Sequence, residues 1–467
     1  MISKIFKAYD VRATYPDPLG ADDAWKVGHA TATFLRRSRS SVGADQRVKN
    51  EDTIVVGRDM RSHSPELAGA LIEGIRSTGM NVIDVGMIDT SCIYFAINHY
   101  ECVGGIQTTA SHNPAQYNGF KISGPKAKPI GSQTGLKDIE RIAGQLTRAG
   151  NTGLTGKLVE EDVWPAYREH VLQFLDLKKP VKIAVDASNG MAGVMVPKVF
   201  GDVENLTMDK ILFETGVEFV HDPNPLVEQN LQMLKDKMKE GQYDAGVCFD
   251  GDADRCIFLD ENGKTIGCDL LTAIIARDFL QMEENKGSAI VYDLRSSHAL
   301  KEEIEKAGGV PKRDRVGHVF MKKTLADTSA VFGGELSGHF YFRDNFNADS
   351  GAIAFARVLS VLSQTDKTLG QLIEPIDRYA HSGEINFKVE DKEGMIRKLG
   401  EKYKSHKIDY LDGITIDASE KEGWWFNVRQ SNTEPMLRLN LEAKTEEQME
   451  SKLAELKSML GEPAVGH

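Results

Sequence analysis

The sequence predicts an α/β protein of about three or four domains with largely parallel sheets. Its 467 residues exceed the size of one ordinary domain, which is about 100–150 residues. Short β-branched runs alternate with amphipathic stretches, a pattern typical of strands joined by helices. Three apolar runs also end abruptly in polar loops, and α/β sheets bind ligands at the carboxyl ends of their strands. These three loops are therefore candidates for a functional site.

The alternation of strand and helix is clearest near the N-terminus. Residues 53–57 (TIVVG) predict a strand. Residues 64–78 predict a helix with Ser64 as its N-cap and Pro65 at the first helical position. Further strands are expected at residues 80–85, 182–186 (KIAVD) and 288–293 (SAIVYD).

The C-terminal part follows a different pattern. Residues 383–389 and 424–429, with a turn near 411–413, predict hairpins, and residues 445–460 predict a closing helix. We therefore expect a smaller α+β domain at this end. The expected domains are residues 1–155, 156–262, 263–375 and 376–467.

Composition argues against several classes of function. A formal charge of −12 disfavours a nucleic-acid-binding or anionic-membrane surface, because both need basic patches. No apolar stretch approaches the ~18 residues of a membrane helix, and no secretory signal is evident. The five cysteines form no Cys-x-x-Cys pair, so neither a disulfide framework nor a structural zinc site is indicated. We expect a cytoplasmic protein with reduced, buried cysteines.

The first polar loop, residues 104–114 (GGIQTTASHNP), places a serine beside a histidine. Its Asn-Pro pair breaks any helix, so Ser111 and His112 are expected to be displayed on a turn. A serine hydroxyl near a histidine and Lys121 could be an activated nucleophile. On local composition alone, a polar turn without function is the commoner explanation.

The second loop, residues 244–255 (DAGVCFDGDADR), contains three alternating aspartates. In an extended segment Asp250, Asp252 and Asp254 would point the same way, and converging carboxylates repel unless a cation neutralises them. Their hard oxygen ligands favour Mg²⁺ or Ca²⁺. A calcium EF-hand is disfavoured because Arg255 stands where that loop needs glycine. A solvated acidic turn is the remaining alternative.

The third loop, residues 330–339 (AVFGGELSGH), carries a carboxylate and a hydroxyl two residues apart. Glu335 and Ser337 could bind one ligand, for example the vicinal hydroxyls of a sugar. Taken alone, this segment is more typical of a glycine-flanked turn.

A fourth segment, residues 429–435 (RQSNTEP), combines a guanidinium with hydroxyls, an amide and loop N–H groups, and Arg438 follows it. This combination suits a phosphate, although a surface turn is an equally good explanation of the segment alone. No Walker A loop or Gly-x-Gly-x-x-Gly loop after a strand is present, so no nucleotide cofactor is expected.

In this order and spacing, the four loops resemble those of the α-D-phosphohexomutase superfamily, within it the bacterial phosphomannomutase/phosphoglucomutase group. The resemblance begins at residues 6–12 (FKAYDVR) and covers essentially the whole chain. It implies four domains around a central cleft: three with similar mixed α/β sheets flanked by helices, and a smaller C-terminal α+β domain. It also implies an isomerase that interconverts hexose 6-phosphate and hexose 1-phosphate, of mannose or glucose, through a phosphoserine and a 1,6-bisphosphate.

The resemblance further implies roles for single residues. Ser111 would carry the phosphoryl group and, with Asp250, Asp252 and Asp254, would bind Mg²⁺. The reacting centre would be lined by Arg12, His112, Lys121, Arg255 and His318, with Lys121 or His112 exchanging a proton with the sugar. Substrate would be bound by Tyr9, Arg295, Glu335, Ser337, His339, Arg429, Ser431, Asn432, Thr433 and Arg438. Hexose 1,6-bisphosphate would be the activator, small hexose phosphates the only partners, and the chain a monomer or homodimer.

Single residues distinguish this chain from the family pattern and from alternative functions. Relatives often carry lysine at the position of Arg295, and arginine keeps the cation but is a poor proton donor. Phosphoglucosamine mutases tend to carry glutamine at Leu336 and often serine at Thr109, so mannose and glucose are favoured here. A metal-dependent sugar-phosphate hydrolase would use Ser111 too, but would not need a second phosphate site. A non-catalytic sugar-phosphate sensor would not need the intact serine and aspartates.

Overall fold

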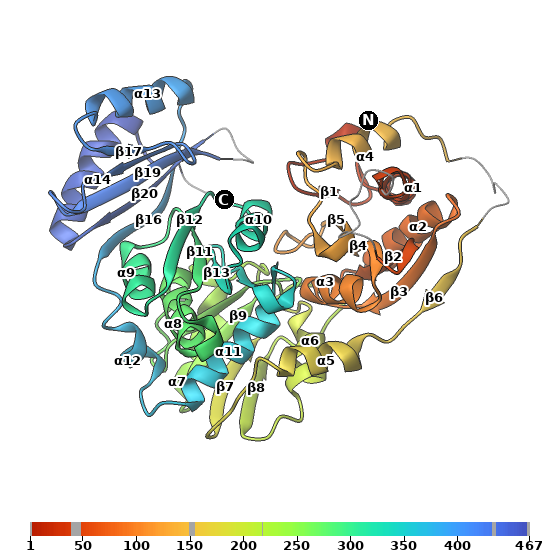
Figure 1. The fold of residues 1–467 in the computed structure, drawn as a ribbon, viewed down its shortest axis with the longest axis horizontal. Helices are drawn as coiled ribbons and strands as arrows, with labels where there is room; N and C mark the ends of the chain where they lie inside the picture. Colours follow the sequence, from red (N-terminus) through yellow and green to blue (C-terminus); the bar gives the residue numbers. More distant parts are fainter. Residues whose placement is uncertain (1, 39–47, 149–154, 217, 432–435, 465–467) are drawn as a thin grey trace. The chain divides into compact units, whose positions relative to one another are not determined.

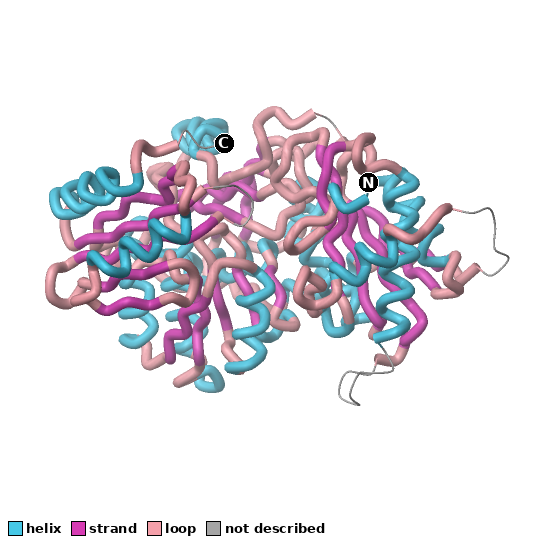
Figure 2. Tube along the Cα trace, turned by 90° about the horizontal axis from the view of Figure 1, so that it is seen from above, coloured by secondary structure: helices cyan, strands magenta, loops and turns pink. Residues whose placement is uncertain are grey.

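The computed structural model describes residues 2–38, 48–148, 155–216, 218–431 and 436–464. The chain divides into two compact units. The first comprises residues 1–266 and 337–370, and the second comprises residues 267–336 and 371–467. Strands and helices alternate along most of the chain (Figures 1 and 2), as the sequence predicted.

The first sheet has the strand order β1-β5-β4-β2-β3-β6. Its strands β2, β3, β4 and β6 are parallel where they pair, whereas β5 pairs antiparallel with both β4 and β1. The strands are β1 (Val11–Thr14), β2 (Asn50–Arg58), β3 (Asn81–Met87), β4 (Cys102–Thr108), β5 (Tyr117–Ser123) and β6 (Leu158–Glu160). The accompanying helices are α1 (Ala21–Ser38), α2 (Ser64–Arg76), α3 (Thr90–His99) and α4 (Leu136–Ala143).

Helix α2 begins at Ser64 as a helical residue, so the expected N-cap was wrong by one position. The N-cap is His63, which makes no side-chain capping hydrogen bond, and Pro65 lies in the first turn. The Ser64 hydroxyl instead donates to Asp59 Oδ1 at 2.5 Å. The Ser64 hydroxyl therefore binds the Asp59 carboxylate instead of capping the helix.

The second sheet has the order β10-β9-β7-β8. Strand β7 pairs parallel with β8 and β9, and β10 pairs antiparallel with β9. The strands are β7 (Val181–Asp186), β8 (Leu206–Ile211), β9 (Ala245–Phe249) and β10 (Cys256–Leu259). The helices of this part are α5 (Trp164–Leu172), α6 (Ala192–Phe200), α7 (Gln232–Glu240) and α11 (Gly351–Ser363).

The third sheet has the order β12-β11-β13-β14-β15. Strand β11 pairs parallel with β12 and β13, and β14 pairs antiparallel with β15. The strands are β11 (Ala289–Asp293), β12 (Val310–Asp314), β13 (Phe332–Gly334), β14 (Phe340–Phe342) and β15 (Ala348–Asp349). The helices are α8 (Cys268–Gln281), α9 (His298–Lys306), α10 (His318–Thr328) and α12 (Leu369–Ile373).

The three sheets share one arrangement, which places the three polar loops at equivalent positions. Each contains three parallel strands in the same relative order, β3-β2-β4, β8-β7-β9 and β12-β11-β13, and the next strand along the sheet is β5, β10 or β14. The polar loops join β4 to β5, β9 to β10 and β13 to β14. The three loops therefore lie at equivalent positions in three sheets of similar topology.

The C-terminal sheet is antiparallel throughout, in the order β16-β20-β19-β18-β17. Its apolar face packs with helices α13 and α14 (Figure 1), in a cluster that includes Leu399, Phe426, Leu439 and Leu456. The elements are β16 (Ala380–Phe387), α13 (Lys392–Lys402), β17 (Lys407–Asp409), β18 (Ile414–Asp417), β19 (Trp424–Gln430), β20 (Leu437–Ala443) and α14 (Glu446–Leu460). The predicted hairpins and closing helix are confirmed, and Thr445 caps α14 by accepting from Gln448 N–H.

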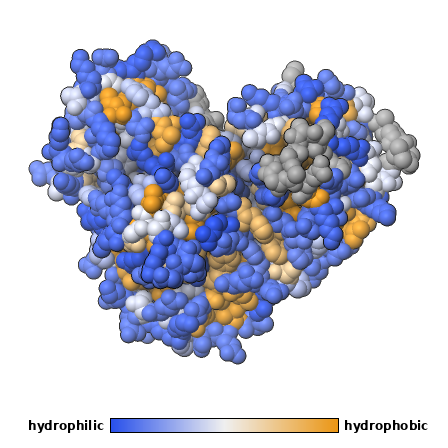
Figure 3. All heavy atoms as spheres, viewed as in Figure 1, coloured by the Kyte–Doolittle hydropathy of each residue, from blue (hydrophilic) through white to orange (hydrophobic). Residues whose placement is uncertain are grey.

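Hydrophilic residues cover most of the face shown in Figure 3. Within the described ranges, no helix is long and apolar enough to cross a membrane. All five cysteines are free and buried, as expected. The expected domain boundaries near residues 155, 262 and 375, and the arrangement of the domains around a cleft, stay predictions.

Candidate active site

Ser111 lies on the turn between β4 and β5, as predicted, but it is not displayed to solvent. It is only 1% exposed, and its φ of 50° lies in the left-handed region. Its N–H donates to Thr109 Oγ1 at 2.9 Å. A non-glycine residue in this backbone region costs free energy and persists only where its surroundings enforce it, as they often do at functional sites.

The buried side chain of Arg61 holds this turn in place. Its guanidinium is anchored by Asp59, whose Oδ2 lies 3.2 Å from Nε. Its other nitrogens donate to backbone carbonyls of the turn, at distances between 2.7 and 3.1 Å. The accepting carbonyls belong to Ser111, Asn113, Pro114 and Tyr117. One side chain therefore fixes both the start and the end of the serine turn.

The three aspartates converge, but not by the predicted geometry. Residues 250–254 form a turn between β9 and β10 rather than an extended segment, with Ala253 at a φ of 58°. One carboxylate oxygen from each of Asp250, Asp252 and Asp254 lies within 4.8 Å of the other two. Gly251 permits this turn to approach the serine turn, because a Cβ there would lie 2.4 Å from the Ser111 carbonyl oxygen.

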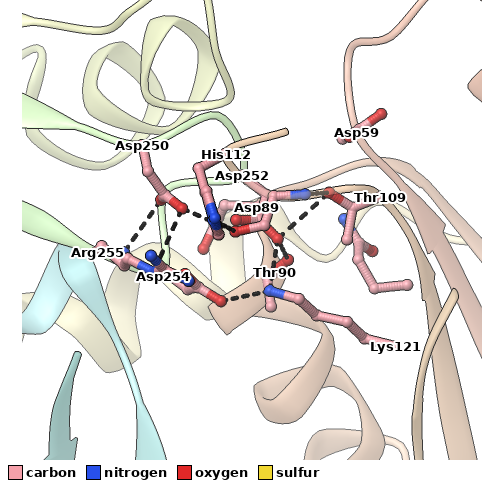
Figure 4. Close-up of polar contacts among 12 residues, drawn as sticks. Asp59, Asp89, Thr90, Thr109, His112, Lys121, Asp250, Asp252, Asp254 and Arg255 are labelled. Carbon is pink, nitrogen blue, oxygen red and sulfur yellow. Dashed lines mark hydrogen bonds and ion pairs between the residues drawn. The ribbon is translucent and has the colours of Figure 1, made fainter. Parts of the chain in front are cut away.

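Polar contacts join the serine turn to the aspartate turn. The Ser111 hydroxyl donates to Asp250 Oδ2 at 2.9 Å, and it lies 3.3 Å from His112 Nδ1. Lys121 on β5 lies between two carboxylates, with Nζ 2.7 Å from Asp252 Oδ2 and 2.5 Å from Asp254 Oδ2 (Figure 4). The two turns thus form one buried polar cluster.

The two oxygens of Asp252 differ in their hydrogen bonds. Oδ2 accepts from Lys121 Nζ, from Thr90 Oγ1 at 2.5 Å and from Thr109 Oγ1 at 3.3 Å (Figure 4). Thr90 also donates its N–H to the Asp252 carbonyl oxygen at 3.0 Å. Oδ1 is buried without a hydrogen-bond partner among the described residues. The carboxylate is held in one orientation with one oxygen available.

Burial and charge shift the pKa values within this cluster in opposite directions. Burial and the other carboxylates raise the pKa of Asp250 well above its usual value. Burial opposes ionisation of Asp254 too, but Lys121 and His339 lower its pKa overall. Burial alone would lower the pKa of Lys121, yet the three carboxylates raise it. Burial and nearby cations lower the pKa of His112, so its ring is neutral at pH 7.

This cluster fits a divalent cation. Three carboxylates within ligand distance of one another are hard donors of the kind Mg²⁺ takes. Asp252 Oδ1 is a buried charged oxygen with no hydrogen-bond partner among the described residues, and such a group is costly unless something binds it. The hydroxyl contact to Asp250 also places Ser111 at the edge of this donor set.

Arg255 and His339 border the carboxylates within the same unit. Arg255 Nε lies 3.7 Å from Asp250 Oδ2 and donates to His339 Nε2 at 3.3 Å. His339 Nε2 lies 3.5 Å from Asp254 Oδ1, and its Nδ1 lies 2.9 Å from Ser337 Oγ. The isolated bridge between Arg255 and His339 holds the two backbones together.

Arg12 on β1 is tied to the serine turn. Its Nη1 donates to Asn113 Oδ1 at 2.6 Å, and its Nη2 forms an ion pair with Asp10 at 2.5 Å. Tyr9 lies in the half-buried segment just before β1. The N-terminal residues therefore join the serine turn through Arg12.

In the second unit, Glu335 and Leu336 of the third loop contact the start of α10 and the end of β11. Glu335, only 2% exposed, accepts from Gly317 N–H at 2.9 Å, directly before His318 at the start of α10. Asp293 holds Arg295 through contacts of 2.8 and 3.0 Å, and it also accepts from Leu336 N–H at 2.8 Å. The end of β11 is thus tied to the loop after β13.

The two arginines among the expected phosphate-binding residues lie on two neighbouring strands. Arg429 is on β19 and Arg438 is on β20, where they are directly opposite each other. Ser431 N–H donates to the Met436 carbonyl at 2.9 Å, at the base of the connection between these strands. Asn432 and Thr433 lie outside the described residues.

Four residues at these sites were missed by the sequence reasoning: Asp59, Arg61, Thr90 and Glu384. Asp59, Arg61 and Thr90 directly follow the carboxyl ends of β2 and β3. Polar residues at the carboxyl ends of parallel strands indicate a ligand site, but the prediction rested only on the three loops that contain glycine or serine. Glu384 gave no comparable signal, because its contacts depend on strand register.

The sequence matches four domain families along its length. They are described as phosphoglucomutase/phosphomannomutase alpha/beta/alpha domain I over residues 3–149, domain II over residues 165–263, domain III over residues 268–379, and the C-terminal domain over residues 384–458. The predicted fold class, with three α/β domains followed by a different C-terminal domain, is confirmed.

Curated relatives and solved structures match over nearly the full chain. A protein named phosphohexose mutases from Xanthomonas campestris pv. campestris (strain B100) is 36% identical over 97% of this chain and 98% of its own. A phosphomannomutase from Vibrio cholerae is 36% identical over 94% of both chains. The crystal structure of a phosphoglucomutase/phosphomannomutase family protein from Burkholderia thailandensis superposes with a TM-score of 0.86 at 29% identity, covering 98% of each chain.

Proposed function

Because the chain belongs to the phosphoglucomutase/phosphomannomutase family, we propose that it is a phosphohexomutase, an isomerase that interconverts hexose 6-phosphate and hexose 1-phosphate. The observation that carries the proposal is the contact between the Ser111 hydroxyl and Asp250, which belongs to a cluster of three carboxylates. It brings a nucleophile to a site suited to a divalent cation. Mannose and glucose phosphates are the proposed substrates.

The proposed reaction consists of two phosphoryl transfers. In the first, the P–Oγ bond of phosphorylated Ser111 breaks, and a P–O bond forms to the free C1 or C6 hydroxyl oxygen, giving hexose 1,6-bisphosphate. The bisphosphate then turns around, and the Ser111 oxygen attacks its other phosphorus, which restores the phosphoserine and releases the isomeric monophosphate. Phosphoryl transfer has a loose transition state, so positioning and charge neutralisation supply most of the catalysis.

His112 is the proposed proton carrier. Its Nδ1 lies 3.3 Å from Ser111 Oγ. Its neutral ring can take the proton of the attacking sugar hydroxyl in the first transfer and return it to the leaving sugar oxygen in the second. Lys121 remains charged between Asp252 and Asp254 and is proposed to keep these carboxylates in place. Arg12 and Arg255 are proposed to lie beside the transferring group, with His318 as a further residue of the reacting centre.

A magnesium ion is proposed to be held by Asp250, Asp252, Asp254 and the phosphate on Ser111. When bound, Mg²⁺ would neutralise the charge of the transferring phosphoryl group. Glu335, Ser337 and His339 are proposed to bind sugar hydroxyls, with Tyr9 and Arg295 as further substrate contacts. The non-reacting phosphate is proposed to bind at Arg429, Ser431, Asn432, Thr433 and Arg438.

A phosphoglucosamine mutase is the alternative within the same chemistry, and Leu336 and Thr109 speak against it. A hydrolase is less well supported, because the paired guanidinium groups of Arg429 and Arg438 suit a second phosphate site that hydrolysis would not need. We also propose a cytoplasmic enzyme, since buried cysteines outside disulfides suit a reducing compartment. We propose that the enzyme is a monomer or a homodimer.

A coupled assay and intact-mass analysis test the proposed function together. Purified protein with Mg²⁺ and a trace of glucose 1,6-bisphosphate should convert mannose 1-phosphate or glucose 1-phosphate faster than glucosamine 1-phosphate. Ser111→Ala should lose at least about 10³-fold in kcat, because removing a covalent nucleophile removes the pathway. Ser132→Ala, which changes a serine between β5 and α4 and outside the site, is the matched control. A phosphate adduct should map to the peptide containing Ser111, and full activity of Ser111→Ala would refute the covalent mechanism.

A further inference from the structure

One face of the C-terminal sheet is polar along its three adjacent strands β16, β20 and β19. Directly opposite residues of antiparallel strands share a face. The register pairs Arg429 with Arg438, and pairs Asn427 with Asn440 next to them. The opposite face carries the apolar cluster that packs on α13 and α14. The two arginines therefore project from the face opposite α13 and α14.

The pairing of Arg429 with Arg438 is unfavourable by itself. Like charges directly opposite each other across two strands destabilise a sheet, and burial increases the cost. Arg429 is only 2% exposed, and its Nε has no hydrogen-bond partner among the described residues. Such a pair needs an anion close by.

Glu384 on β16 supplies that anion. Its Oε2 lies 2.8 Å from Arg429 Nη2, and its Oε1 lies 2.8 Å from Arg438 Nη1. Oε2 also lies 3.5 Å from Arg295 Nη1 and accepts from Asn440 Nδ2 at 3.4 Å. One carboxylate thus contacts all three guanidinium groups expected to bind the substrate.

A local irregularity of β16 aims Glu384 at the arginines. His381 pairs with Glu442 and Glu384 pairs with Asn440, so β16 advances three residues while β20 advances two. Gly383, within this bulge, has a φ of 66°. Bulges re-aim side chains and recur beside active sites. The extra residue puts Glu384 on the polar face, opposite Asn440.

Glu384 stays ionised and accessible. Burial alone would raise its pKa, but Arg295, Arg429 and Arg438 lower the pKa to about 2. Its side chain is nevertheless 26% exposed. A solute can therefore reach the carboxylate and Arg438, whose side chain is 24% exposed, whereas the side chain of Arg429 is 3% exposed.

We propose that Glu384 is an internal counter-ion of the phosphate site, with which the non-reacting phosphate of the hexose competes for Arg429 and Arg438. The inference rests on the proposed function, because it takes these arginines as the phosphate site. Without ligand, Glu384 prevents the guanidinium groups from repelling each other. With ligand, the phosphate displaces the carboxylate or shares the arginines with it. Binding is weaker than three guanidinium groups alone would give, which favours release and turning of the bisphosphate.

Glu384→Gln tests the competition, because the amide keeps the shape of the side chain and removes its charge. Binding of glucose 1-phosphate is measured by calorimetry in a Ser111→Ala background, where no phosphoryl transfer occurs. The Kd should fall at least tenfold in Glu384→Gln. The ligand-free variant should melt at a lower temperature than its parent, and glucose 1-phosphate should raise its Tm by more. Glu393→Gln, the same charge change at an exposed position of α13, should leave Kd and Tm unchanged.

An unchanged or higher Kd in Glu384→Gln would overturn the proposal and make Glu384 a positioning residue only. If that variant does not fold, Glu384→Asp replaces it. Its shorter side chain cannot keep both 2.8 Å contacts, so a several-fold lower Kd is expected and an unchanged Kd contradicts the competition. Turnover of wild-type protein is measured in parallel. Absence of mutase activity would refute the proposed function, whereas the Kd comparison alone decides the role of Glu384.

Discussion

Single buried side chains determine the shape of the candidate site. The serine turn depends on Arg61, whose guanidinium binds four backbone carbonyls and is itself held by Asp59. The Ser64 hydroxyl and the Arg61 N–H both donate to Asp59 Oδ1. These bonds hold the carboxylate so that its other oxygen, Oδ2, accepts from Arg61 Nε. The sequence predicted Ser111 as the nucleophile but not Arg61 as the residue that positions its turn, since a polar residue near the end of a strand does not reveal which backbone carbonyls it contacts.

Arg61→Met should destabilise the protein by about 3–5 kcal/mol, because it leaves the buried Asp59 carboxylate and four carbonyls without their donor. Urea unfolding measures the loss. Asp59→Asn combined with Arg61→Met should cost clearly less than the sum of the two single changes, because the pair is coupled. Additive effects would show that Arg61 acts on the turn independently of Asp59.

At the scale of elements, the connections after parallel strands carry both chemistry and stability. Beyond the serine and aspartate turns, the end of β7 provides an example. His221 in the loop after β8 places Nε2 3.2 Å from the buried Asp186 Oδ2 and Nδ1 2.9 Å from the Asp222 carbonyl oxygen. Both ring nitrogens face acceptors, so the doubly protonated imidazolium fits best. Burial alone would lower the pKa of His221, but Asp186 and the Asp222 carbonyl raise it overall.

The raised pKa of His221 gives a defined pH dependence of stability. The folded state binds the proton more tightly than the unfolded state, so this contribution is complete below the unfolded value of about 6.5 and is lost as pH rises through the folded pKa. His221→Gln should therefore cost about 1.5–3 kcal/mol at pH 5.5, and less at pH 9. Urea unfolding of both proteins at the two pH values provides the measurement. His99→Gln, at an exposed position of α3, is the control, and a cost independent of pH would contradict the ion pair.

At the scale of the whole molecule, the proposed cation would connect two sheets. The aspartates follow β9 of the second sheet, whereas Ser111, Lys121 and Thr90 belong to the first. A bound ion would therefore stabilise the association of these two parts as well as the chemistry. The three carboxylates also repel one another without it, and this repulsion adds to burial in raising the pKa of Asp250.

Mg²⁺ added to metal-free protein should therefore raise Tm as well as activity. At a concentration of 100 times Kd, one site contributes about 2.7 kcal/mol to the folded state. Asp252→Asn should weaken this stabilisation most. Thr90→Val, which removes only one donor to Asp252 Oδ2, should weaken it less. Calorimetric scans with EDTA and with Mg²⁺ measure both effects, and an unchanged Tm in wild-type protein would rule out a cation at the aspartate turn.

The sequence by itself determined the elements and the identity of the chemical groups. Short β-branched, apolar runs predicted the strands near residues 53–57, 182–186 and 288–293, because such runs favour an extended, buried conformation. Asn-Pro after the serine predicted a turn for a similar local reason, whereas the aspartate segment was expected to be extended and forms a turn. The resemblance to a known family, carried by four short segments, supplied the function.

The tertiary structure alone decided how these groups meet. The contact of Ser111 with Asp250 joins residues 139 positions apart, and Thr90 reaches Asp252 across 162 positions. Glu384 contacts Arg429 and Arg438 because a bulge shifts the register of β16 by one residue. Such contacts depend on strand register and on packing between segments distant in sequence. Local propensity contains no information about either, which is why the contacts of Glu384 with the two arginines could not be predicted from the sequence.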